Sequence, residues 1–136
     1  MKKIYVDTDI IFDLFLERKP YFESAFVTFQ LAAEGKINLY ISSLCFTNLF
    51  YVMRKKLKRE QVIDYLKKLN SIVNVLAVDE RIISSAIQSD FNDFEDAVQY
   101  FTAKENGMEV LLTRNIEDYK VEDISIMTAE EFLKIL

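Results

Sequence analysis

The fold of this chain is decided by the stretch Lys3-Ile4-Tyr5-Val6-Asp7-Thr8-Asp9. Its first four residues form a short run rich in β-branched and aromatic side chains, which predicts a buried strand. Two carboxylates, Asp7 and Asp9, follow this strand at once. Polar side chains directly after a buried strand indicate a site at the carboxyl end of that strand.

Short apolar runs of this kind recur along the chain, each flanked by polar or helix-breaking residues and separated from the next by helical periods. Strands that alternate with helices favour an α/β fold: a single domain, residues 1–136, with a central parallel sheet of about five strands flanked by helices. Thr128, with Glu131 three residues later, forms a capping-box pattern before the last helix. The predicted strands lie near residues 3–6, 37–41, 72–78, 108–112 and 124–127. The predicted helices are a short first helix that closes at Leu14 to Arg18, and residues 21–34, 43–57, 59–70, 79–89, 93–106 and 128–135.

The composition limits the chemistry that this domain can perform. The chain has 136 residues, no histidine, one cysteine and two glycines. A nucleophilic role for Cys45 would need a histidine partner, so we expect this thiol to fill the core. Two glycines exclude a glycine-rich phosphate loop. No apolar run is long enough to span a membrane, and we expect a cytoplasmic protein without a membrane partner.

Oxygen ligands are therefore the only plentiful metal-binding groups, and oxygen suits Mg²⁺ or Mn²⁺. Besides Asp7 and Asp9, carboxylates occur at Asp93 and Asp96, and at Asp118 after an apolar run that ends at residue 112. The carboxyl ends of parallel strands collect ligands at one edge of the sheet. The sequence thus predicts an enzyme whose carboxylates hold a metal.

The charge balance allows two interpretations of the basic residues. A net charge of −5 argues against a protein that coats nucleic acid non-specifically. The run Arg54-Lys55-Lys56-Leu57-Lys58-Arg59 nevertheless concentrates positive charge, and it predicts a local face that binds phosphates. The same run is also typical of a solvated helix end, where basic side chains complement the helix dipole.

Four segments, taken in order, resemble the motifs of PIN domains. The resemblance spans nearly the whole chain and is closest to small stand-alone bacterial members, including the VapC-type toxins of toxin–antitoxin pairs, which are metal-dependent ribonucleases. It implies a PIN-like three-layer α/β/α arrangement. The segments are Val6-Asp7-Thr8-Asp9 with Asp13, Ile41-Ser42-Ser43-Leu44, Asp93-Phe94-Glu95-Asp96-Ala97, and Leu112-Thr113-Arg114-Asn115 with Asp118-Tyr119.

The resemblance assigns roles to individual carboxylates. Asp7 matches the first acidic residue of the PIN site, and Asp96 matches the acidic residue that opens the Asp-Ala helix. Asn115 and Asp118 match the last polar and acidic groups, and either of them can face the metal. As catalytic residues the resemblance implies Asp7, Asp96 and Asp118.

Other residues are expected to support these ligands, or simply to cap helices. The hydroxyl of Thr113 is available to hydrogen-bond either Asp7 or a metal-bound water, whereas Thr8 is a candidate cap of the first helix. Asp93 either caps the helix that contains Asp96 or supports the metal ligands. Asp118 can instead initiate a turn.

The chain departs from the PIN pattern at Asn48, where most active members carry a glutamate. A neutral amide oxygen should lower metal affinity, and a second ion in particular could be lost. Asp9, where many relatives have asparagine, could partly restore the charge. The alternative interpretation of Asp9 is a first-turn acid that favours the helix dipole.

The predicted function is hydrolysis of RNA phosphodiesters with Mg²⁺ or Mn²⁺, in a toxin of a toxin–antitoxin pair. The nucleic-acid-binding residues would be Arg54, Lys55, Lys58 and Arg114. One alternative is a catalytically weakened PIN fold that binds nucleic acid or a partner. Another is an aspartate-nucleophile phosphatase of the haloacid dehalogenase type, suggested by the Asp7-Thr8-Asp9 order.

The expected partners follow from the resemblance as well. They are RNA, a small antitoxin and a second copy of the chain. The apolar residues considered for a homodimer interface are Phe46, Phe50, Tyr51 and Tyr65, each of which could instead belong to the core of the monomer.

Overall fold

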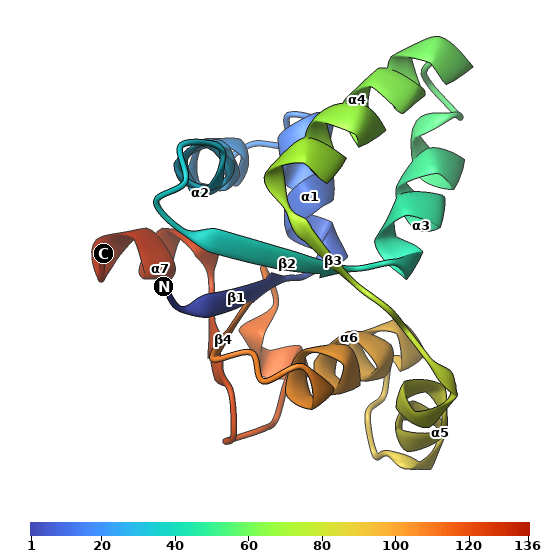
Figure 1. Ribbon diagram of the computed structural model, residues 1–136, viewed down its shortest axis with the longest axis vertical. Coiled ribbons are helices and arrows are strands. Elements are labelled where there is room, and N and C mark those ends of the chain that lie inside the picture. Colours follow the sequence, from blue (N-terminus) through green and yellow to red (C-terminus); the bar gives the residue numbers. More distant parts are fainter.

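Five short apolar segments form one parallel sheet in the computed structural model, which describes residues 1–136 (Figure 1). The strand order is β3-β2-β1-β4-β5, so β1 is the central strand. This arrangement confirms the predicted α/β fold with a five-stranded parallel sheet. The strands are β1 (Lys3–Val6), β2 (Asn38–Ser42), β3 (Asn74–Leu76), β4 (Val110–Leu112) and β5 (Ser125–Met127).

Seven α-helices connect and cover the strands, and each predicted helix is present with ends that differ by a few residues. One short 3₁₀ helix, η1 (Ile116–Asp118), was not predicted, because a three-residue turn carries no periodicity. The predicted capping box of Thr128 and Glu131 is confirmed. The helices are α1 (Thr8–Phe15), α2 (Phe22–Ala33), α3 (Leu44–Met53), α4 (Arg59–Ile72), α5 (Glu80–Gln88), α6 (Phe94–Glu105) and α7 (Ala129–Lys134).

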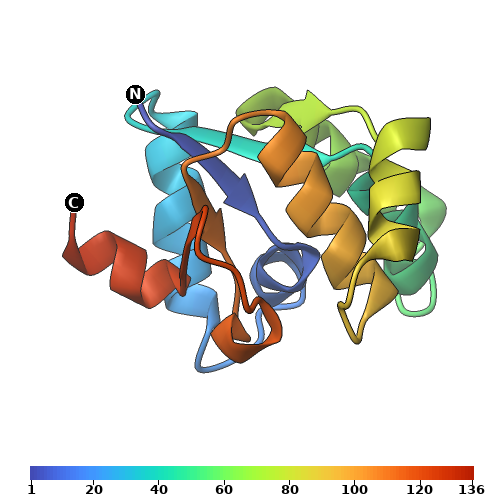
Figure 2. The same cartoon turned by 90° about the horizontal axis from the view of Figure 1, so that it is seen from below.

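Alternate side chains of β1 point to the two faces of the sheet, as a strand requires. Ile4 and Val6 belong to the larger core, under the face that α1, α2, α3 and α4 cover. Tyr5 belongs to a second core on the opposite face, together with Tyr100 of α6. Figure 2 shows α6 alongside β1. Because helices cover both faces, the central strands β2, β1 and β4 are mostly buried, and the polar site must lie where these strands end.

The register of the central strands brings two chain segments together at that end. Val6 of β1 pairs with Leu112 of β4, and the backbone N–H of Asp7 donates to the carbonyl of Leu112 at 2.9 Å. The ladder therefore continues one residue beyond β1. It fixes Asp7 beside Thr113, the residue that follows β4.

The four aromatic residues considered for a dimer interface are not equivalent. Phe46, Phe50 and Tyr65 are partly buried and pack against the larger core, whereas Tyr51 is 70% exposed. The prediction that each belongs to the core is confirmed for three of them and is wrong for Tyr51. None of the helices combines the length and the apolar character that crossing a membrane requires.

Candidate active site

Asp7 lies at the centre of the polar site and is almost fully buried. Its side chain accepts the backbone N–H of Asp9 and therefore caps α1, a role that was expected of Thr8 and that falls to Asp7 because α1 begins one residue later. Oδ1 of Asp7 also accepts the side-chain amide of Gln99 at 2.8 Å. Oδ2 accepts the hydroxyl of Thr113 at 2.9 Å, which confirms the predicted contact. Neutral donors thus fix this carboxylate from three sides.

Gln99 of α6 connects Asp7 to the start of α1. Its Oε1 accepts the backbone N–H of Thr8 at 3.1 Å and the hydroxyl of Tyr5 at 3.3 Å. Because its oxygen is held by donors, its amide nitrogen is turned toward Asp7. Sequence reasoning missed Gln99. The available signal was its position three residues after Asp96, on the same face of a helix.

Tyr119 lies between Asp7 and Asp96, two of the three predicted catalytic carboxylates. Its buried hydroxyl lies 3.0 Å from Oδ2 of Asp7 and 3.4 Å from Oδ1 of Asp96, and it can donate to either. Burial, followed by the charges of Asp7 and Asp96, raises the pKa of this phenol, so it remains a neutral donor. The sequence motif contained Tyr119, but its bridging position could not be seen before the chain folded.

Asp96 faces an open acidic cavity of about 780 Å³. The backbone N–H of Asp96 donates to Oδ1 of Asp93 at 3.0 Å, so Asp93 is the N-cap of α6. Asp118 ends η1 and lines the same cavity from the other side. Asp7 does not line this cavity, because the hydroxyl of Tyr119 lies between Asp7 and Asp96. The lining residues are Ser89, Asp90, Phe91, Asn92, Asp93, Asp96, Glu117, Asp118 and Lys120.

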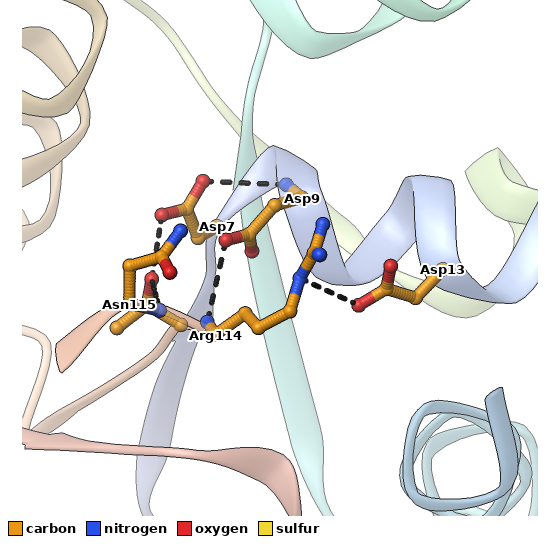
Figure 3. Close-up of polar contacts among 6 residues, drawn as sticks. Asp7, Asp9, Asp13, Arg114 and Asn115 are labelled. Carbon is orange, nitrogen blue, oxygen red and sulfur yellow. Dashed lines mark hydrogen bonds and ion pairs between the residues drawn. The ribbon is translucent and has the colours of Figure 1, made fainter. Parts of the chain in front are cut away.

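On the other side of Asp7, two further carboxylates meet an arginine (Figure 3). Oδ2 of Asp9 accepts the backbone N–H of Arg114 at 3.3 Å. Asp13, which is 1% exposed, forms an ion pair with Nε of Arg114 at 3.3 Å. The guanidinium also lies over the ring of Tyr21, 4.5 Å from its centroid. Arg114 is thus engaged by the protein itself. Asp9, Asp13 and Arg114 are called the arginine side of the site below, and Asp96, Asp118 and Tyr119 the tyrosine side.

The pKa values show how poorly this negative charge is compensated. Burial, and then the charge of Asp7, raises the pKa of Asp9 to about 7. The same two causes raise the pKa of Asp96 to about 7. The pKa of Asp13 is also raised by burial, although Arg114 opposes the shift. Near neutral pH the site therefore holds carboxylates that lack a counter-charge.

Asn48 and Glu95 line a second cavity, of about 190 Å³, together with Cys45 and Gln99. Burial raises the pKa of Glu95, with Asp7 as the next cause. Burial also raises the pKa of the Cys45 thiol to about 11, and the sulfur lies 3.0 Å from the hydroxyl of Thr8. Cys45 is buried, which confirms that it fills the core. The position that lacks a glutamate thus faces a glutamate on α6.

The chemistry of these donors fits a hard divalent cation. The oxygens are carboxylates, amides and hydroxyls, and Oδ1 of Asp9 is buried without a hydrogen-bond partner. A cation would supply the missing counter-charge. However, no three acidic, histidine or cysteine side chains lie close enough together to form a ready ligand group.

The remaining predicted residues lie at two places. Asn115 is exposed and its backbone N–H donates to Oγ1 of Thr113, which ties it to Asp7 (Figure 3). Arg54, Lys55 and Lys58 lie in the exposed loop between α3 and α4, at the end of the molecule remote from α5 (Figure 1). Sequence reasoning grouped these basic residues with Arg114, and the structure separates them from it.

The chain matches a family model described as PIN domain over residues 3–117, and it belongs to the PIN domain family. This membership removes the basis for the haloacid dehalogenase alternative. Ribonuclease VapC1 of Aquifex aeolicus (strain VF5) is 29% identical over 136 residues, which are 96% of this chain and 93% of that protein.

Solved structures share the fold at low sequence identity. DNA-bound VapBC from Salmonella typhimurium has a TM-score of 0.69 and 21% identity, and the match covers 95% of this chain and 99% of that one. VapC20 of Mycobacterium tuberculosis, described as a Sarcin-Ricin loop cleaving toxin, has a TM-score of 0.66 and 14% identity, and the match covers 90% of this chain and 98% of that one.

Proposed function

We propose that this protein is a metal-dependent endoribonuclease that acts as the toxin of a toxin–antitoxin pair, and that residues 1–136 form one PIN-like domain. The observation that carries the proposal is the cluster around Asp7, where Asp9 and Asp96 have pKa values raised to about 7. Arg114 is paired with Asp13, and Lys120, which lines the acidic cavity, is exposed and forms no ion pair with Asp96. A polyanion can approach such a cluster only when a metal ion neutralises it. The similarity to Ribonuclease VapC1 supports RNA as the substrate.

Asp7, Asp9, Asp96 and Asp118 would hold Mg²⁺ or Mn²⁺. Such an ion, when bound, would activate a water molecule, neutralise the attacked phosphate and stabilise the leaving oxygen. No nucleophilic side chain is required, which agrees with the absence of histidine and with the raised pKa of Cys45.

The other residues of the site position these carboxylates. Thr113, Gln99 and Tyr119 donate hydrogen bonds to Asp7 and hold its two oxygens in place. In our proposal Asp93 orients α6 through its cap, Asn115 fixes the loop after β4, and Asn48 completes the wall on the α3 side.

For phosphate binding we assign Arg54, Lys55 and Lys58, which are exposed and carry concentrated positive charge. Arg114 was predicted with them. Its guanidinium is occupied by Asp13 and Tyr21, so we assign it instead to neutralising Asp13.

The proposed partners are an antitoxin, which the resemblance to VapC-type toxins implies, and a second copy of the chain. The cytoplasm is the proposed compartment, because its RNA is the substrate that such a toxin needs. A small antitoxin would have to block access to the acidic cavity or to the basic loop.

A catalytically weakened binding module is the second candidate. Two observations favour it: Asn48 supplies no charge, and no ready group of three metal ligands exists. Titration with Mn²⁺ separates the candidates, since an active nuclease must bind the ion and a pure binding module need not.

The test compares Asp7→Asn with Asp64→Asn, which changes an exposed carboxylate on α4. Removing a direct ligand should lower Mn²⁺-dependent RNA cleavage by at least about a hundredfold, while Asp64→Asn should leave the rate unchanged. Asparagine is also a good N-cap, so α1 should persist. Circular dichroism checks folding, and a folded Asp7→Asn protein that cleaves RNA at the parent rate would refute the proposal.

A further inference from the structure

One face of α3 is exposed along the whole helix. Leu44, Asn48 and Tyr51 are separated by four and three residues, so they lie in one row on the helix surface. Leu44 is 43% exposed and Tyr51 is 70% exposed, and Asn48 is exposed as well. The opposite face of the helix carries Cys45, Leu49 and Met53, all of which are buried. The row is therefore a solvent-facing strip. It is called the α3 strip below.

The lower end of the α3 strip reaches the candidate active site. Leu44 and Asn48 line the 190 Å³ cavity together with Glu95 and Gln99. Gln99 in turn donates to Asp7 at 2.8 Å. A single side chain thus separates the strip from the central carboxylate.

The upper end of the α3 strip reaches the basic loop (Figure 1). Nζ of Lys55 lies over the ring of Tyr51, 5.1 Å from its centroid. Arg54 and Lys58 lie in the loop that follows α3, Arg59 begins α4, and all three are exposed. Tyr51 lies about 5 Å, or one helical turn, beyond Asn48 along the axis. The strip therefore changes from polar and acidic surroundings to aromatic and basic ones over a short distance.

We propose that the α3 strip guides single-stranded RNA into the active site, with a nucleobase stacked on Tyr51 and phosphates bound by Lys55 and the rest of the basic loop. This inference rests on the proposed ribonuclease function. An exposed aromatic ring beside cations matches the two features that nucleic acid presents, a flat base and a charged backbone. Only an unpaired base can stack on a side chain, so the strip selects single strands.

The charge pattern favours a polyanion as the occupant of the α3 strip. The basic loop concentrates five positive charges in six residues, in a protein whose net charge is −5. A polyanion gains from neutralising its phosphates with these side chains. Two α3 strips packed antiparallel about a two-fold axis would not bring the two basic loops together, so the measurement of molar mass decides for or against a second copy.

The experiment measures binding of a fluorescein-labelled single-stranded RNA of mixed sequence by fluorescence anisotropy. The full chain with Asp7→Asn is the background, so that the strand is not cut. Adding Tyr51→Ala should raise Kd about fivefold to a hundredfold, because stacking of one base is worth about 1–3 kcal/mol. Tyr51→Phe should restore binding. Phe26→Ala, which removes an exposed ring on α2, should change nothing.

Two further measurements sharpen the test. Lys55→Ala should reduce the dependence of log Kd on log salt by about one. The same strand annealed to its complement should bind the Tyr51→Ala protein and its background equally. Light scattering gives the molar mass of each variant.

Equal Kd values for Tyr51→Ala and its background would overturn the proposal. A Tyr51→Ala protein that loses a dimer, and loses RNA binding only in proportion, would also overturn it and would assign the ring to an interface between copies. Failure of the proposed function looks different: the unsubstituted chain would then cleave no RNA with Mn²⁺, whatever stands at position 51.

Discussion

The arginine side and the tyrosine side both hold carboxylates that are partly or fully buried, but they differ in whether a positively charged side chain is paired with them. On the arginine side, Asp13 is almost fully buried and is neutralised by Arg114 at 3.3 Å. On the tyrosine side, Asp96 lies near a phenol, the cap residue Asp93 and the carboxylate of Asp118. It forms no ion pair, although Lys120 lines the same cavity. The protein thus supplies its own counter-charge to Asp13, whereas Asp9 on the same side still has a pKa raised to about 7. The comparison indicates that the other side is built to receive a counter-charge from solution.

Asp7 belongs to neither side and is influenced by both. Its charge raises the pKa of Asp9 on one side and of Asp96 on the other. Its own oxygens are held by neutral donors. A cation placed near Asp7 would therefore relieve repulsion on both sides at once, which is why we regard it as the most informative residue to change.

The largest expected effect is on stability, after Arg114→Met. The change leaves Asp13 buried without its counter-charge, and breaking a buried ion pair costs about 3 kcal/mol or more. Chemical denaturation at pH 8 measures the loss. Arg81→Met is the matched control, because Arg81 pairs with Glu105 at a similar 3.5 Å but is 81% exposed, and should cost under about 1 kcal/mol. An equal loss in the free energy of unfolding for Arg114→Met and Arg81→Met would show that the pair of Asp13 with Arg114 is no stronger than an exposed ion pair.

The second effect is the pH dependence of Mn²⁺ binding. Because a metal ion binds the ionised carboxylates, protonation of Asp9 and Asp96, both with a pKa of about 7, competes with it. Between pH 8 and pH 6 the affinity should fall about tenfold for each group that binds the ion. Calorimetry in two buffers of different ionisation enthalpy also counts the protons released. Affinity that stays constant over this range would contradict the raised pKa values.

The same pKa values predict that, without metal, the stability of the fold decreases as the pH rises, whereas the affinity for Mn²⁺ increases. Since the pKa of Asp9 and Asp96 is raised from 3.8, the folded state binds protons more tightly than the unfolded state between about pH 4 and pH 7. Stability should therefore fall as the pH rises through this range. Thermal unfolding at pH 5.5 and pH 8 measures it, and added Mn²⁺ should reverse the order.

A third, smaller effect concerns the tyrosine side alone. Tyr119→Phe removes the hydroxyl that holds Asp7 and Asp96 together, and the loss of such a supporting contact typically lowers metal affinity about tenfold. Tyr100→Phe is the control, since that hydroxyl bonds Asp123 at 2.6 Å, away from Asp7. Tighter Mn²⁺ binding by Tyr119→Phe would show instead that the phenol occupies the position of the ion.

The smallest expected effect is an increase in Mn²⁺ affinity after Asn48→Glu. Asn48→Glu adds a carboxylate to the wall that Glu95 already faces, so Mn²⁺ should bind a few times more tightly. The gain is limited because the new charge is also repelled by Glu95. Asn74→Glu on the edge strand β3 is a control for added charge. Calorimetry that finds no difference between the two variants would count against the idea of a missing ligand.

Periodicity was sufficient to predict the fold. Each strand is a short apolar run and each helix has a regular apolar face, so residues near one another in sequence determine the elements. The order of the strands could not be obtained in this way, because it depends on which apolar faces pack together once the chain has collapsed.

The site was predicted less completely. Asp7 and Thr113 could be placed because each directly follows a strand, and Asp9 because it lies two residues beyond Asp7 in the first turn of α1. Gln99 and Tyr119 could not, since their roles depend on where the folded chain places α6 and the residue that follows η1. The ion pair of Asp13 with Arg114 joins residues 101 positions apart, and nothing local distinguishes it from the exposed basic residues of the loop.

The burial of Cys45 has a practical consequence for experiments. At neutral pH a thiol with a pKa of about 11 is ionised in about one molecule in ten thousand, and this one is also covered by the core. A maleimide dye should therefore not react with Cys45. A cysteine introduced at an exposed position would be the sole labelling target, which makes the chain suited to single-molecule fluorescence without any prior removal of its natural thiol.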